Sequence, residues 1–128
     1  MYYFNVKRHD SFTNVIAEVT ESLKTEGFGI LTEIDVQATL KKKLGIERKP
    51  YIILGACNPQ LAHRALEIDP NIGLLLPCNV VVSEESDGSV LVSFMDPLAV
   101  MGLVNKPEIL EIAQDAYDRL KRIQTKLS

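Results

Sequence analysis

The chain lacks the sequence motifs of the common catalytic and nucleotide-binding families. It has no GxGxxG or Walker loop, no GxSxG nucleophile elbow and no HExxH zinc-binding helix. It has only two histidines and two cysteines, and Cys57 and Cys78 lie 21 residues apart, outside any CxxC pair. This cysteine pattern excludes zinc-ribbon and thioredoxin-like proteins.

Long hydrophobic runs are also missing. The longest apolar stretch, residues 72–82, is interrupted by Pro77 and Asn79 and is shorter than the ~20 residues that a membrane-spanning helix needs. In residues 1–8, charge follows the apolar residues and no signal-peptide core is present. We therefore expect no membrane association and a cytoplasmic location, where both cysteines would be reduced.

Charge and composition limit the possible partners. Seventeen acidic and fourteen basic residues give a net charge of −3, whereas a general nucleic-acid binder is basic, so we expect no nucleic-acid partner. Hydrophobic residues make up 46% and charged residues 24% of the 128 residues, as in globular proteins. We expect a single domain over residues 1–128 that buries roughly two-thirds of its unfolded surface.

Hydrophobic periodicity and turn residues predict an α+β fold in the order β-α-β-(α)-β-α-β-β-α. A doubly wound nucleotide-binding sheet is excluded, because the helices do not separate all the strands. We therefore expect a mainly antiparallel sheet with the helices packed on one face. Pro77 marks an edge, a bulge or the start of its strand, because proline cannot donate to a strand ladder. The predicted strands are 2–8, 30–36, 51–56, 74–82 and 90–95, and the predicted helices are 12–26, 36–44, 59–68, 98–104 and 107–123.

Two similar tripeptides stand out, Cys57-Asn58-Pro59 and Pro77-Cys78-Asn79. Asn58 followed by Pro59 is typical of a helix start. The positive end of that helix would favour a Cys57 thiolate, with His63 on the flank of the same helix as a partner for catalysis. The alternative is that Cys57 is a small buried hydrophobic residue and His63 a surface residue.

Strand alternation separates the residues of the second tripeptide. Cys78 shares a face with Val80 and Val82, which indicates a core position. Asn79 points to the opposite face with Val81, where its amide needs hydrogen-bonding partners. Asn79 either satisfies the backbone around Pro77 or contacts a ligand.

Three segments carry a resemblance to a known family: residues 27–36, residues 54–59 together with Ala62 and Ala65, and residues 75–80. In this order and spacing, the sequence resembles the bacterial family called domain of unknown function 302, over nearly the whole chain. The resemblance implies a small α+β fold that is cytoplasmic and dimeric. It implies no established activity.

These features support three hypotheses. The first is a binding or sensing module whose pocket is formed by Cys57, Asn58, Cys78 and Asn79. Its ligand would be a small molecule, or zinc or copper(I) held by Cys57, Cys78 and His63. The second is a thiol-dependent enzyme with Cys57 as nucleophile. The third is a structural protein that dimerises. We expect a homodimer in any case, because Pro77 in a Val- and Leu-rich segment suggests an exposed sheet edge, which proteins normally cover.

Overall fold

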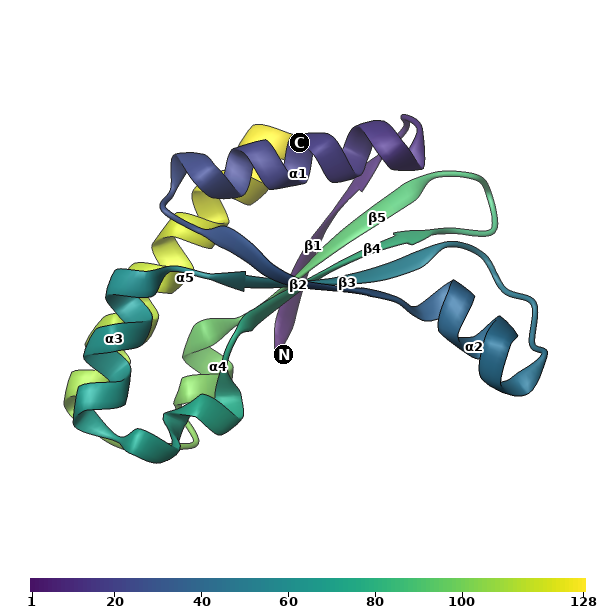
Figure 1. The fold of residues 1–128 in the computed structure, drawn as a ribbon. Helices are drawn as coiled ribbons and strands as arrows, with labels where there is room; N and C mark the ends of the chain where they lie inside the picture. Colours follow the sequence, from purple (N-terminus) through teal and green to yellow (C-terminus); the bar gives the residue numbers. More distant parts are fainter.

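The computed structural model describes all 128 residues, and it confirms the α+β fold (Figure 1). The strands are β1 (Tyr3–Arg8), β2 (Gly29–Asp35), β3 (Tyr51–Cys57), β4 (Cys78–Glu84) and β5 (Val90–Met95). The helices are α1 (Phe12–Thr25), α2 (Val36–Leu44), α3 (Pro59–Ile68), α4 (Pro97–Met101) and α5 (Pro107–Leu127), with a 3₁₀ helix, η1, at Pro70–Leu75.

The five strands form one antiparallel sheet in the order β1-β5-β4-β3-β2. The first strand therefore joins the C-terminal hairpin, and β4 lies in the middle of the sheet. Pro77 precedes β4 directly, so it marks the start of a central strand. The interpretation of Pro77 as part of an exposed sheet edge is wrong, since only β1 and β2 are edge strands.

The predicted strand at 74–82 begins later than expected. Residues 70–75 form η1, because the Asp69 side chain accepts a hydrogen bond from Asn71 N and Pro70 fits the first turn. The apolar Leu74 and Leu75 therefore belong to a helical turn, and β4 starts only at Cys78. Apolar residues alone do not distinguish a buried strand from such a turn.

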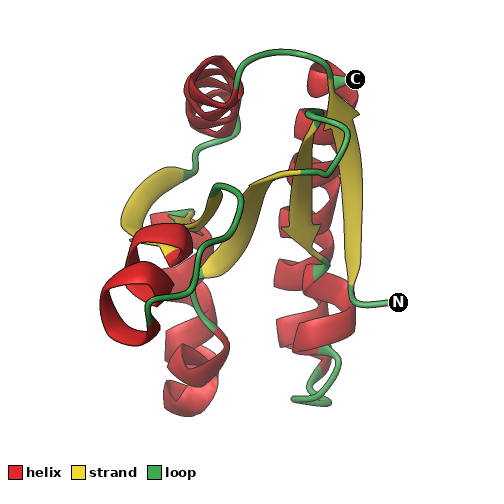
Figure 2. Cartoon of the chain, turned by 90° about the vertical axis from the view of Figure 1, so that its right-hand side faces the viewer, coloured by secondary structure: helices red, strands yellow, loops and turns green.

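The sheet has an inner face that carries the core. Alternate residues such as Leu54, Val80, Val82 and Phe94 point inward and are almost fully buried. They pack against the apolar stripes of α1 and α5 in one hydrophobic cluster. Figure 2 shows the long C-terminal helix running alongside the strands.

We call the opposite side the outer face. Its members follow from strand alternation and from the registers that pair them across the sheet. No helix supplies buried residues there, and α2, which follows β2, has none. The outer-face residues are Tyr3, Asn5, Lys7, Gly29, Thr32, Ile34, Tyr51, Ile53, Gly55, Cys57, Asn79, Val81, Ser83, Leu91, Ser93 and Met95.

The helices α2 and α3 lie at opposite ends of β3 (Figure 1). At one end, α3, η1 and α4 gather beside α5, and this end contains the candidate site described below. None of the helices combines the length and apolar composition that a membrane span requires.

Candidate functional site

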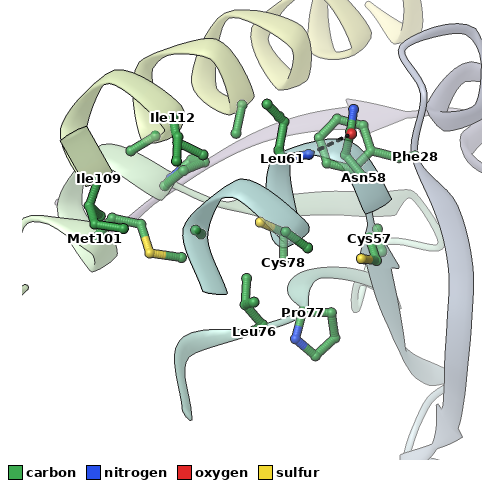
Figure 3. Close-up of a pocket in the computed structure, with 16 residues that line it drawn as sticks. Phe28, Cys57, Asn58, Leu61, Leu76, Pro77, Cys78, Met101, Ile109 and Ile112 are labelled. Atoms are coloured by element: carbon green, nitrogen blue, oxygen red, sulfur yellow. Dashed lines mark hydrogen bonds between the residues drawn. The ribbon is translucent and has the colours of Figure 1, made fainter. Parts of the chain in front are cut away.

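A small pocket with a cavity volume of about 40 Å³ lies between the adjoining ends of β3 and β4 and the helices α3, α4 and α5. Thirteen of its sixteen lining residues are hydrophobic. Figure 3 shows Cys57 and Pro77 at one end of the pocket and Met101 and Ile109 at the other. Because Cys57 and Pro77 are half-buried while Met101 and Ile109 are buried, the mouth lies at the strand ends and the closed end lies against α4 and α5.

Five alanines create the space. They come from β3, α3 and α5, so three elements each present small side chains to the same cavity. A core is normally packed as densely as an organic crystal, and larger aliphatic residues at these positions would fill the volume. The alanines are Ala56, Ala62, Ala65, Ala113 and Ala116.

Both cysteines line the pocket, as the sequence predicts for a site around the two tripeptides. Cys78 is 8% exposed, and burial, followed by the charge that Cys57 would carry, raises the pKa of its thiol to about 11. Burial also raises the pKa of the half-buried Cys57, against the direction expected from the helix start. Both thiols are therefore neutral at pH 7, and a ready nucleophile is not assembled here.

The side-chain amide of Asn58 forms hydrogen bonds that stabilise the fold. Its Oδ1 accepts a hydrogen bond from Leu61 N at 3.2 Å and so caps α3, as predicted. Its Nδ2 donates to the carbonyl of Glu26 at 3.3 Å, and the guanidinium of Arg119 donates to the same carbonyl at 2.9 Å. The amide thus joins the α1–β2 turn, the start of α3 and α5 into one frame beside the pocket.

Asn79 and His63 do not join the other predicted site residues in the pocket. Asn79 is exposed on the outer face and lines a separate, shallow hollow there with Tyr3 and Tyr51. His63 is exposed on α3 and does not line the pocket. No group of three or more His, Cys, Asp and Glu side chains is close enough to hold a metal ion. The ligand set Cys57, Cys78 and His63 is therefore not assembled in this structure.

The three sequence segments that carry the family resemblance meet at this site. Phe28 comes from the first, Cys57 and Asn58 from the second, and Leu76, Pro77 and Cys78 from the third. The sequence reasoning missed the wall opposite, which α4 and α5 supply. Its signal was the small Ala113 and Ala116 within the buried stripe of α5, at positions where a packed core would favour larger residues.

Comparisons with known proteins confirm the family resemblance. A family model described as "Domain of unknown function DUF302" matches residues 4–127. The chain belongs to the DUF302 family. A crystal structure of an uncharacterized conserved DUF302 protein from Bacillus stearothermophilus is similar to the chain, with 34% sequence identity and a TM-score of 0.92. The similarity covers 100% of this chain and 99% of that one. No curated protein matches the chain.

Proposed function

We propose that this DUF302 chain is a binding or sensing module that takes a small apolar molecule into the alanine-lined pocket. The observation that carries the proposal is the convergence of five alanines from three elements on one cavity. Empty space of this kind costs stability, because the atoms around it lose van der Waals contacts. A ligand of matching shape would restore those contacts, and the free energy gained would appear as affinity.

The polar groups of the pocket support an uncharged ligand. The amide of Asn58 is occupied by Leu61 and Glu26. The thiol of Cys78 is held neutral by burial, and no lining residue carries a charge. An ionised group inside such a site would lose its hydration without compensation. The part of the ligand that enters the pocket is therefore aliphatic or aromatic.

The two alternatives have less support. The metal hypothesis is left with Cys57 and Cys78 alone, since His63 is exposed and does not line the pocket. The thiol-enzyme hypothesis loses its general base for the same reason, and the raised pKa of Cys57 opposes thiolate formation. Elemental analysis of protein purified without added metal tests the first alternative, and we expect only substoichiometric zinc and copper.

We also propose that two copies associate through the middle of the outer face around Val81 and toward the β4–β5 hairpin, where no helix contributes a buried residue. Thr32 and Asn79 lie toward the pocket end of their strands, at the margin of this contact. This face carries tyrosine, methionine and aliphatic side chains over five strands, and Lys7 is its only charged member. Protein interfaces are enriched in aromatic residues and methionine and depleted of charge at their centres. Because Lys7 is the only charged residue on each copy of this face, little like-charge repulsion opposes the association of two copies.

A titration with 1-hexanol, followed by amide NMR, tests the binding proposal. We expect shift changes confined to residues around the pocket, such as Cys57, Ala65 and Ala113. Ala62→Leu at the mouth and Ala65→Leu deeper inside would fill the cavity and abolish these changes. The matched control is Ala17→Leu, the same substitution at an exposed position of α1. Shift changes that are absent in the wild type, or equal in all variants, would rule out this pocket as the site.

A further inference from the structure

We infer that the ligand is an amphiphile whose polar end is uncharged, such as a hydroxyl, carbonyl or amide group, and that Thr32 and Asn79 bind this end at the pocket mouth. The inference rests on the proposed function, since it requires the apolar end to occupy the pocket. It assigns a role to two exposed polar side chains that the pocket itself does not use.

The two side chains lie on either side of Gly55. In the antiparallel register, Gly55 pairs with Thr32 on β2 and with Asn79 on β4. Residues paired in this way have side chains on the same face of the sheet. Cys57, two residues further along β3, ends the strand at the pocket mouth. The Thr32 hydroxyl and the Asn79 amide thus lie on either side of Gly55, and the Cys57 thiol follows on the same face two residues further along β3.

The missing side chain at Gly55 lets the Thr32 hydroxyl lie close to the pocket. A Cβ at Gly55 would overlap with Thr32 Oγ1 and would come within 3.0 Å of Pro77 Cγ. The Thr32 hydroxyl and the Pro77 ring therefore close over the glycine, in the space that any other side chain would occupy. Pro77 also lines the pocket, so a single residue separates the Thr32 hydroxyl from the apolar mouth.

Thr32 and Asn79 are available for a ligand. Both are exposed, and neither is engaged by hydrogen bonds of the kind that occupy Asn58. A hydroxyl and an amide together offer both donors and acceptors. They match a ligand group that donates or accepts and that carries no charge.

The charged side chains around Thr32 and Asn79 either point to the other face of the sheet or form contacts elsewhere. Glu33, next to Thr32, pairs with Leu54 and so points to the opposite face. Ion pairs Lys7–Asp87 and Lys49–Glu84 lie toward the hairpin end of the sheet. Asp96, which follows β5, caps α4 through Leu98 and Ala99. A carboxylate or ammonium group on the ligand would find no counterion beside Thr32 and Asn79, and it would lose part of its hydration on approaching the mouth.

A series of six-carbon ligands tests this inference on the full-length protein. We would compare 1-hexanol with hexanoate and hexylammonium at pH 7 and about 0.15 M salt, which screens long-range attraction and repulsion. We expect 1-hexanol to bind at least about ten-fold more tightly than either ion. Weaker binding of both ions, which have opposite charge, separates a local preference from the net charge of the protein.

Substitutions test whether Thr32 and Asn79 bind the polar end of the ligand. Thr32→Val and Asn79→Ala should each weaken 1-hexanol binding by about three- to ten-fold, the effect of one lost hydrogen bond. Thr32→Ser, which keeps the hydroxyl, should bind like the wild type. Ser93→Ala is the matched control, because it removes an outer-face hydroxyl on β5, away from Gly55.

The outcomes separate this inference from the proposed function. If 1-hexanol enters the pocket but the two ions bind equally well, or if Thr32→Val and Asn79→Ala bind like the wild type, the inference is wrong while the apolar pocket stands. If none of the three ligands shifts the amides around Ala65 and Ala113, the proposed function itself fails. Loss of binding in Ser93→Ala as well would also contradict the assignment to Thr32 and Asn79.

Discussion

The side-chain amide of Asn58 packs against Gly27. A Cβ at Gly27 would stand 2.9 Å from Asn58 Nδ2, and the φ of Gly27 is +83°, a value that favours glycine. The close approach lets Nδ2 reach the carbonyl of Glu26, one residue before the glycine. Gly27, in the first of the three segments that carry the family resemblance, therefore makes room for Asn58 in the second, and together they fix the frame of the pocket.

This contact predicts that Asn58→Ala is strongly destabilising. The substitution removes the cap of α3 and leaves the carbonyl of Glu26 with only Arg119 as a donor. We expect a loss of about 2 kcal/mol in the free energy of unfolding, measured by urea denaturation. Asn79→Ala, the same substitution in the similar tripeptide, should change stability by less than about 0.5 kcal/mol, because Asn79 is exposed. Equal losses in the two variants would contradict the assigned role.

The comparison of these two asparagines also explains what the sequence could predict. Local sequence signals were sufficient to predict helix starts and strand faces. Asn58-Pro59 and Asp96-Pro97 start helices as expected. Strand alternation correctly predicted that Cys78 is buried and that Asn79 is exposed. Such signals depend on a few neighbouring residues. The antiparallel arrangement followed in the same way from the short hairpin between β4 and β5.

The candidate site could not be predicted in full, because it depends on contacts between residues that are far apart in the sequence. The bond from Asn58 to Glu26 spans 32 residues, and the bond from Arg119 to the same carbonyl spans 93. No local pattern encodes these pairings. The order of strands was likewise not predicted, so Pro77 was interpreted as an edge residue although β1 pairs with β5 and leaves β4 at the centre.

Acid should weaken the fold through Glu26. Its hydrogen bonds to Arg122, and then the positive charges of Arg122, Lys126 and Arg119, hold the pKa of this carboxyl below its ordinary value of 4.5, against a smaller opposing effect of burial. Because the folded-state pKa is the lower one, the stabilisation is complete above pH 4.5 and is lost as the pH falls through the folded-state pKa.

Glu26→Gln measures this contribution. Its stability should be lower than that of the wild type at pH 7, and the difference should shrink toward pH 3 in urea denaturation curves. The side chains of Asp10 and Asp87, whose carboxyl pKa values are also lowered, remain in both proteins and cancel in the comparison. A difference that does not depend on pH would mean that the ion pair with Arg122 contributes nothing.

The two cysteines should react at different rates. Cys57 is half-buried at the pocket mouth, whereas Cys78 is buried and its pKa is raised to about 11. We expect iodoacetamide to alkylate Cys57 at least several-fold faster, with a rate that rises between pH 7 and pH 9 as its thiolate forms. Peptide mass spectrometry follows each site separately. Saturating 1-hexanol should slow Cys57, because it occupies the space behind the mouth; faster labelling of Cys78 would overturn the assignment.

The proposed dimer can be disrupted at the centre of the outer face. Val81 lies on β4, the middle strand, and Val81→Glu would place two carboxylates against each other or against apolar side chains in a symmetric contact. We expect the wild type to be a dimer at micromolar concentration by light scattering coupled to gel filtration, and Val81→Glu to be a folded monomer. Leu74→Glu, at an apolar position of η1 that is 86% exposed, should remain dimeric. A monomeric wild type, or a dimeric Val81→Glu, would exclude this face as the interface.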